Sequence, residues 1–270
     1  MSPREVQDLW QDDLGGLWPA CRPGQSIRSR RQLVRRPPQV RACRRRLARP
    51  VPRPRMTPVT ETEPPAGASP GAGGHWDDVY RTRAVDQLSW HQPSPAASLR
   101  LIGPRPGPDS PAVDVGGGAS TLVDVLLRDG WTVTVLDVSA EALAITGRRL
   151  GAKTAEVSLV VSDVLAWQPD QTYDVWHDRA VLHFLTEVAD RARYVELAAD
   201  TVTEGGALVI GGFAPDGPSH CSGLPTARRS AEQLAGEFAP RFTLEHAETE
   251  AHHTPGGAVQ QFTWVRLRRR

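Results

Sequence analysis

The chain has 270 residues, of which 39% are hydrophobic and 23% are charged, and its formal net charge is +1. No apolar run approaches the roughly 18 residues that a membrane-spanning helix needs, so the composition excludes a membrane protein. The near-neutral net charge is the sum of a basic N-terminal part and an acidic remainder. Residues 1–55 hold 14 Arg against 4 acids, whereas residues 56–270 contain more acids than bases.

The segment over residues 1–73 is rich in arginine, proline and glycine, and shows no periodic apolar pattern. Such a composition cannot bury enough apolar surface to offset chain entropy, so we predict a disordered extension and linker. Three interpretations stay open: an arm that contacts nucleic acid through phosphates, an organellar presequence, or translation from a start upstream of a natural start at Met56. We favour the last. Residues 74–270 are predicted to form one domain.

Three cysteines are too few for a disulfide framework, and residues 1–20 contain no apolar secretory segment. The expected location is therefore the reducing cytoplasm. No His/Cys cluster has the spacing of a zinc site. His252 and His253 are adjacent but lack other ligands nearby in the sequence, so we predict no metal site.

From Gly74 onward, segments of helical periodicity alternate with apolar runs rich in β-branched residues. This alternation predicts βαβ units, and hence a doubly wound α/β fold with a mainly parallel sheet and a ligand at the carboxyl ends of its strands. Helices are predicted over 75–90, 94–102, 119–130, 139–151, 186–203 and 230–238, and strands over 112–117, 131–137, 156–163, 172–180, 206–213, 241–250 and 258–269. The last two strands are predicted to be antiparallel.

Capping residues predict several helix boundaries. Ser139 and Ser230 precede helices as N-caps, and Gly151 follows the helix that Ser139 opens. Asp77 and Asp78 are placed in the first turn of the helix over 75–90, where the helix dipole favours acids.

A glycine-rich turn lies directly between the first predicted strand and the next helix, in the sequence Asp114-Val-Gly116-Gly-Gly118-Ala-Ser120. Glycines there allow a tight turn and the close approach of a ligand to the main chain. The following strand ends in Asp137, from which a carboxylate can accept the ribose hydroxyls of a nucleoside. Two alternatives remain: Asp114 as a buried structural acid and Asp137 as a turn former.

With Ser162-Asp163-Val164 after the third strand, the chain resembles the class I S-adenosylmethionine-dependent methyltransferases over residues 75–270. The resemblance implies a seven-stranded, mainly parallel sheet with its last strand antiparallel, and S-adenosylmethionine as the cofactor. It also implies roles for individual residues: Asp114 near the methionine end of the cofactor, Gly116 and Gly118 beneath it, Asp137 at the ribose hydroxyls, Asp163 at the adenine amino group and Val164 on the adenine ring. Ser120 departs from the family, which commonly has a third glycine there.

The block WHDRAVLHFL after the fourth strand resembles a WHDRAVFHFLT block found in a group of small bacterial methyltransferases of this class. Its position predicts that it faces the transferable methyl group. His177 or His183 could take a proton from the acceptor, with Asp178 orienting the imidazole. We rank Asp178 and His183 above His177, which lies closer to the strand. The structural alternative is an Asp178–Arg179 ion pair and a satisfied helix histidine.

Residues 75–92, called the lid segment below, precede the first strand and carry Trp76, Tyr80, Trp90 and His91. Trp76 and Tyr80 are predicted to contact the cofactor, because aromatic faces suit a sulfonium cation. The alternative is that these aromatic residues only pack the lid segment on the sheet.

Two further segments are candidates for the same site. Cys221 lies in a Gly/Pro-rich loop after the fifth strand, and either faces substrate or is a buried small side chain. His252 and His253 lie in the predicted hairpin between the last two strands, over the same pocket.

The acceptor is predicted to be a small molecule. Residues 56–270 contain no basic patch, which disfavours nucleic acid, and no Asn/Asp-Pro-Pro-aromatic motif follows the fourth strand. Two other functions remain as alternatives: an NAD(P)-dependent oxidoreductase and a non-catalytic cofactor-binding protein. The sequence leaves the acceptor unidentified and allows either a monomer or a homodimer.

Overall fold

The computed structural model describes residues 72–270, so the predictions on residues 1–71, including a start at Met56, lie outside the described residues. Its main element is a seven-stranded sheet with the order β3-β2-β1-β4-β5-β9-β8. The strands are β1 (Pro111–Val115), β2 (Thr132–Asp137), β3 (Val157–Val161), β4 (Tyr173–Arg179), β5 (Val202–Phe213), β8 (Phe242–His253) and β9 (Val259–Arg269). Strands β1 to β5 are parallel, and β9 is antiparallel to both of its neighbours. The predicted mainly parallel sheet with its last strand antiparallel is confirmed.

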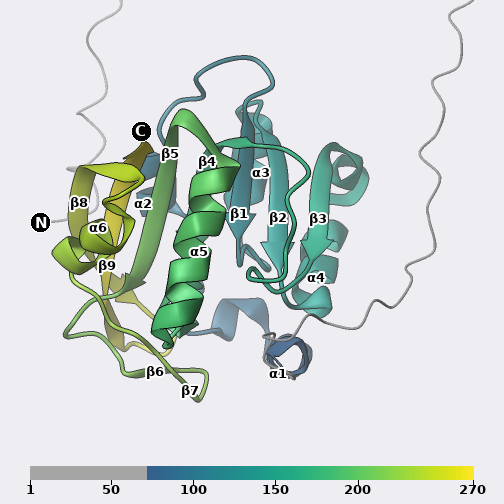
Figure 1. Cartoon of the computed structure of the whole chain (residues 1–270). Helices are drawn as coiled ribbons and strands as arrows, with labels where there is room; N and C mark the ends of the chain where they lie inside the picture. Colours follow the sequence, from purple (N-terminus) through teal and green to yellow (C-terminus); the bar gives the residue numbers. More distant parts are fainter. Residues whose placement is uncertain (1–71) are drawn as a thin grey trace, which may run out of the picture. The chain divides into compact units, whose positions relative to one another are not determined.

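Helices cover both faces of the sheet (Figure 1). One face packs against α2 (Ala96–Ile102), α3 (Leu122–Arg128) and α4 (Ala140–Leu150), and the other against α5 (Val188–Thr201) and α6 (Ala231–Phe238). The doubly wound arrangement is therefore confirmed. The remaining elements are α1 (Ala72–Thr82), the short 3₁₀ helices η1 (Val85–Gln87), η2 (Gly151–Glu156) and η3 (Leu182–Phe184), and the two-residue strands β6 (His220–Cys221) and β7 (Leu224–Pro225).

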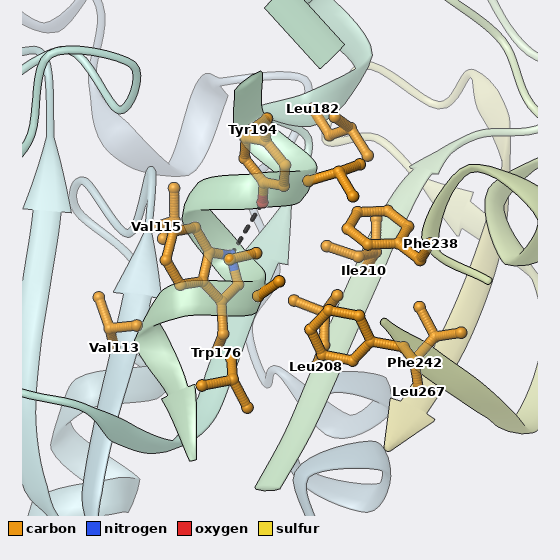
Figure 2. Close-up of a cluster of buried hydrophobic side chains, with 14 of the residues drawn as sticks. Val113, Val115, Trp176, Leu182, Tyr194, Leu208, Ile210, Phe238, Phe242 and Leu267 are labelled. Carbon is orange, nitrogen blue, oxygen red and sulfur yellow. Dashed lines mark hydrogen bonds between the residues drawn. The ribbon is translucent and has the colours of Figure 1, made fainter. Parts of the chain in front are cut away.

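The core under α5 fixes the position of β4. Trp176 from β4 is fully buried, and its indole N–H donates to the Tyr194 hydroxyl of α5 at 2.9 Å (Figure 2). The two rings also meet edge to face, with centroids 5.6 Å apart. An aromatic pair of this kind adds stability beyond the area it buries. The end of β4, where the WHDRAVLHFL block begins, is thus anchored from this face.

The predicted caps of two helices are confirmed. Ser139 accepts from the backbone N–H of Ala142, Gly151 ends the same helix with a φ of +58°, and Ser230 forms a capping box with Gln233. Ser139 follows two residues after Asp137, the last residue of β2, so the strand ends directly before the N-cap of α4.

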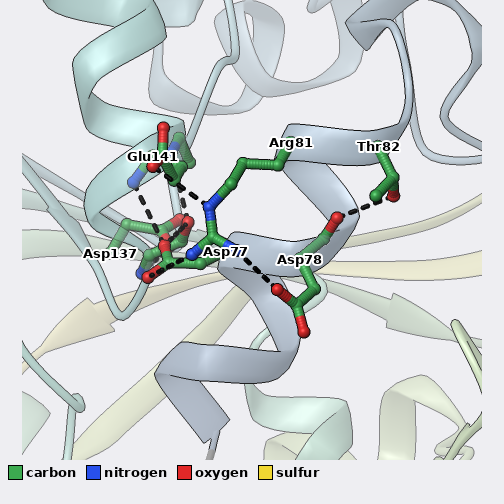
Figure 3. Close-up of polar contacts among 8 residues, drawn as sticks. Asp77, Asp78, Arg81, Thr82, Asp137 and Glu141 are labelled. Carbon is green, nitrogen blue, oxygen red and sulfur yellow. Dashed lines mark hydrogen bonds and ion pairs between the residues drawn. The ribbon is translucent and has the colours of Figure 1, made fainter.

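The prediction that Asp77 and Asp78 lie in the first turn of their helix is wrong, because α1 begins at Ala72 and has no acid in its first turn. The Asp77 carboxylate instead accepts from the Ser139 hydroxyl at 2.6 Å and from the backbone N–H of Glu141 at 3.1 Å. Asp77 therefore caps α4, not its own helix. Arg81 adds ion pairs to Asp78 and Glu141, so α1 is joined to the start of α4 by polar contacts (Figure 3).

In Figure 1, α1 lies below the arrowheads of β1 and β2, at the carboxyl-end edge of the sheet, and the β6–β7 hairpin lies at the lower left, below α5. The hairpin belongs to the Gly/Pro-rich loop after β5, in which β6 pairs with β7. Within residues 72–270, no helix combines the length and the apolar character that crossing a membrane requires.

Candidate cofactor and acceptor site

A cavity of about 530 Å³ lies at the carboxyl ends of β1, β2, β3 and β4. The floor comes from these strand ends and the residues that follow: Val115, Gly116, Leu136, Asp137, Val138, Ser162, Asp163 and Val164. The lid segment contributes His75, Trp76, Tyr80 and Trp90, and the opposite wall contains Val181, Phe184, Leu185, Cys221, Leu224 and Pro225. The cavity therefore lies where the doubly wound fold predicts a ligand.

The glycine turn brings the main chain close to its neighbours. Gly116 and Gly118 have φ of +66° and +47°. A Cβ at Gly116 would lie 2.0 Å from Val181, and one at Gly118 would lie 2.7 Å from the Tyr80 hydroxyl and 3.1 Å from Asp137. Larger residues would be strained and would collide with these groups. The absence of a side chain at Gly118 thus leaves room for Tyr80 of the lid segment and for Asp137 against the turn.

Asp137 is the buried acid of the cavity floor, with 8% of its surface exposed. Its Oδ1 accepts from the backbone N–H of Ser139 at 2.8 Å. Burial raises the pKa of Asp137 to about 7; the charge of Asp114 adds to this, and bonds from Ser139 and Gly118 oppose it. Asp137 therefore gains and loses its proton near neutral pH, which is unusual for a carboxyl group that serves only as a turn former.

Asp163 and Val164 line the cavity next to Asp137. Asp163 Oδ1 accepts from the backbone N–H of Leu165 at 2.8 Å, which is an ordinary turn contact. Asp163 thus fixes the turn after β3 and also borders the cavity. Val164 is buried and offers an apolar surface beside it.

Asp114 belongs to a buried network. Because Asp114 and His177 are register partners on β1 and β4, His177 Nδ1 lies 2.7 Å from Asp114 Oδ1. His177 Nε2 lies 2.9 Å from the Ser98 hydroxyl of α2. The network borders a smaller cavity of about 70 Å³, beside the glycine turn. His177 therefore orients Asp114 and does not line the large cavity.

The structure corrects the prediction that Asp178 faces the acceptor. The side chain is fully buried, and its carboxylate accepts from the backbone N–H groups of Val181 and Leu182 and from the Tyr194 hydroxyl. It lines neither cavity of the site, and it forms no ion pair with Arg179. Asp178 holds the turn after β4 in place. Burial raises its pKa to about 6, although the three donors oppose the shift.

His183 is also placed away from the large cavity. Ala180, with a φ of +73°, reverses the chain after β4, and η3 then directs His183 into the core. The imidazole packs 4.6 Å from the ring of Phe213 and 4.4 Å from that of Phe184. Burial, together with the charge of Arg179, lowers its pKa to about 3. The prediction of His183 as the proton acceptor is therefore corrected, since such an imidazole is a weak base near neutral pH.

Trp76, Tyr80 and Trp90 of the lid segment line the large cavity and also pack against one another. Trp76 meets Trp90 edge to face at 5.6 Å and Phe184 at 5.3 Å, and Tyr80 lies 6.2 Å from Trp90. Burial raises the pKa of Tyr80, so its hydroxyl keeps its proton at neutral pH. These residues therefore both line the site and hold the lid segment on the sheet. His91 lines the smaller cavity.

Cys221 lines the large cavity, and burial raises the pKa of its thiol to about 11. The predicted placement of His252 and His253 over the pocket is corrected. His252 Nε2 lies 2.7 Å from the carbonyl of Ser89 and so holds the lid segment, while His253 is exposed at the end of β8.

Comparison with known proteins recognises a methyltransferase domain in part of the chain. Residues 112–206 match the family model of a methyltransferase domain. Nodulation protein S of Rhizobium tropici is 32% identical over 115 residues, which are 43% of this chain. The match spans 48% of that protein, about half of its length. A methyltransferase domain is thus recognised over residues 112–206, and the similarity to nodulation protein S supports the class I S-adenosylmethionine-dependent methyltransferases.

Solved structures share the methyltransferase fold. A structure from work on the conversion of a disulfide bond into a thioacetal group during echinomycin biosynthesis has a TM-score of 0.58 and 21% identity, covering 73% of this chain and 92% of that one. The N-methyltransferase NodS of Bradyrhizobium japonicum WM9, in complex with S-adenosyl-l-homocysteine, has a TM-score of 0.52 and 19% identity, covering 64% of this chain and 84% of that one.

His75 and Arg179 line the cavities but were not predicted as site residues from the sequence. His75 lines the large cavity from α1, and its Nε2 is buried without a hydrogen-bond partner in the described chain. Arg179, predicted only as an ion-pair partner of Asp178, lines both cavities. In the sequence, His75 is one polar residue of a helix with aromatic neighbours, so no local pattern indicates its role.

Proposed function

We propose that this chain transfers a methyl group from S-adenosylmethionine to a small-molecule acceptor. The observation that carries the proposal is the large cavity. It joins a buried carboxylate at the end of β2, a second carboxylate at the end of β3 and an aromatic lid segment, within a methyltransferase fold. No observation favours the dinucleotide-dependent oxidoreductase or the non-catalytic binding protein.

The residues of the cavity floor fit the cofactor. Asp137, at the end of β2, would accept hydrogen bonds from the two ribose hydroxyls, and Asp163 would accept one from the adenine amino group; both residues line the cavity. Val164 and Leu136 offer apolar surfaces to the adenine ring. Asp114, which His177 orients, provides negative charge for the ammonium group of the methionine end, beside the glycine turn.

Bound S-adenosylmethionine supplies an activated methyl group on a sulfonium. The protein then has to orient the acceptor in line with that methyl group and exclude water. Trp76, Tyr80 and Trp90 provide aromatic surface that tolerates the sulfonium charge. Phe184 and Leu185 form an apolar wall for the acceptor on the other side of the cavity.

An oxygen or nitrogen acceptor has to lose a proton, and we assign the role of the base that removes it to His75. Its imidazole lies in the cavity wall, and the buried Nε2 has no partner among the described residues. Imidazole is the side chain best suited to proton transfer near neutral pH. NodS of Bradyrhizobium japonicum is an N-methyltransferase, and this similarity supports amines as the first acceptors to test.

The proposal is tested by turnover and by binding. The full chain is incubated with S-adenosylmethionine and panels of small amines, phenols and thiols, and the release of S-adenosylhomocysteine (SAH) is followed through its conversion to homocysteine. Calorimetry with SAH and with NAD runs in parallel. Saturable SAH binding and turnover with members of one panel are expected. Binding of NAD in place of SAH would contradict the proposal.

The role of Asp137 predicts a pH dependence of SAH binding. The ribose hydroxyls donate to the ionised carboxylate, whereas the carboxyl group, whose pKa burial raises to about 7, is mostly protonated at lower pH. Because only the ionised fraction is competent, SAH should bind about tenfold more weakly at pH 6 than at pH 8. Calorimetry across this range measures the affinity and the proton released on binding.

Asp137→Asn is the matched control, because the amide does not titrate. This variant should bind SAH with an affinity that no longer changes between pH 6 and pH 8. Asp137→Ala should weaken binding by about 1.5–3 kcal/mol at pH 8, the loss expected for hydrogen bonds to a charged group. An unchanged affinity in Asp137→Ala would remove Asp137 from the ribose site.

A further inference from the structure

Arg179, the last residue of β4, lies between the two cavities and lines both. Its Nη1 donates to the carbonyl of Trp90 at 2.9 Å, and its guanidinium carbon lies 4.8 Å from the centre of the Phe262 ring. Its Nε and Nη2 are buried and have no hydrogen-bond partner among residues 72–270. Most of the N–H groups of the Arg179 guanidinium therefore donate no hydrogen bond within the described residues.

The acids near Arg179 are bound elsewhere. Glu250 accepts from the Gln92 amide with one oxygen and from the Trp264 indole with the other. Asp114 is held by His177. Within the described chain no carboxylate forms an ion pair with Arg179. Burial lowers the pKa of Arg179 to about 10, which still leaves it charged at neutral pH.

A buried cation with free donors is rare in folded proteins, because losing hydration is costly unless a partner replaces the water. The planar guanidinium fork matches a carboxylate in geometry and charge. The cavity wall next to Arg179 is aromatic and apolar, through Trp90, Phe184 and Leu224. The surroundings of Arg179 thus suit a molecule that has an anionic group and an apolar body.

We propose that Arg179 binds a carboxylate of the methyl acceptor, so that the acceptor is an anionic small molecule with an apolar or aromatic part. The inference rests on the proposed function and names the substrate class of the same site. Because Arg179 ends β4, it would place the carboxylate at the junction of the two cavities and leave the rest of the acceptor beside Phe184. The carboxylate of the cofactor is the other anion that could reach Arg179, and the experiment separates the two.

The first measurement uses the full chain saturated with SAH, titrated with benzoate and with benzamide in a calorimeter. Benzoate should bind at least about tenfold more tightly than the neutral benzamide, as expected for a charge-assisted contact with a buried fork. In Arg179→Gln this preference should disappear, and in Arg179→Lys it should be reduced. Arg83→Gln is the matched control, because Arg83 is exposed in the lid segment and lines neither cavity.

Equal affinities for benzoate and benzamide in the natural chain, or a preference that survives in Arg179→Gln, would overturn the proposal. Thermal unfolding is measured for each variant. If Arg179→Gln does not fold, Arg179→Met replaces it, since the unbranched side chain fills the space of the arginine stem.

The second measurement compares the affinities of SAH and of 5′-methylthioadenosine, which lacks the amino-acid carboxylate. Arg179→Gln should change the two affinities by the same factor. A selective loss of SAH affinity would assign Arg179 to the cofactor's carboxylate and overturn its assignment to the acceptor. If SAH does not bind the natural chain at all, the proposed function itself fails, whatever the benzoate titration shows.

Discussion

Replacing His75 by glutamine should lower turnover about 10²- to 10⁴-fold, the contribution typical of a general base, and should leave SAH affinity nearly unchanged. The expectation follows from position. His75 is a histidine that lines the large cavity, whereas His177 binds Asp114 and Ser98, and His183 packs on Phe213. Glutamine keeps the polarity and most of the volume of the side chain but cannot take up a proton. SAH production at saturating S-adenosylmethionine measures the effect, with an amine or phenol as acceptor.

His253→Gln is the matched control, because His253 is exposed at the end of β8. It should turn over like the natural chain. A thiol acceptor provides a second comparison, since a thiol is partly ionised near pH 7 and depends less on a base. Undiminished turnover of an amine or phenol by His75→Gln would remove His75 from the chemistry.

Replacing Asp178 by alanine should lower the stability of the protein, because Asp178 holds a buried turn and is not a reacting group. Its carboxylate is the acceptor for two backbone N–H groups and the Tyr194 hydroxyl, all in the buried turn after β4. Leaving these donors unsatisfied should lower the free energy of unfolding by about 3–5 kcal/mol. For a domain of this size, the melting temperature should fall by roughly 6–20 °C. Calorimetric or optical melting measures both quantities.

Two variants on α5 control the Asp178 experiment. Tyr194→Phe removes one of the three donors and should cost about 1–2 kcal/mol. Asp190→Ala removes an acid from the partly exposed first turn of the same helix and should change stability by less than about 1 kcal/mol. If Asp178→Ala melts like the natural chain but has lost turnover, the residue belongs to the chemistry after all.

The fold could be predicted because its signals are local. Ser139, Ser230 and Gly151 mark helix ends through their own backbone chemistry, and the apolar runs mark strands that are buried on both faces. The cofactor side could be predicted for the same reason. Asp114, the glycine turn and Asp137 lie within one βαβ unit, so their spacing in the sequence determines their spacing in the structure.

The residues after β4 could not be placed from the sequence, because contacts from distant segments orient them. Asp178 turns inward because Tyr194, a full turn and more into α5, donates to it. His183 turns inward because Ala180 adopts a left-handed conformation that its residue type does not indicate. His75 and Arg179 belong to the site only because the lid segment folds back over the strand ends.

Ser139 takes part in two contacts that were described separately: its N–H donates to Asp137, and its hydroxyl donates to Asp77 of the lid helix. Asp137, which we assign to the ribose, and Asp77, which joins α1 to α4, are therefore both hydrogen-bonded to Ser139. Lifting α1 removes a partner from the turn that positions Asp137, so the closed lid and the formed ribose site favour each other. This reciprocity predicts that a cofactor bound at Asp137 strengthens the contact between α1 and α4, and that weakening this contact weakens cofactor binding by the same factor.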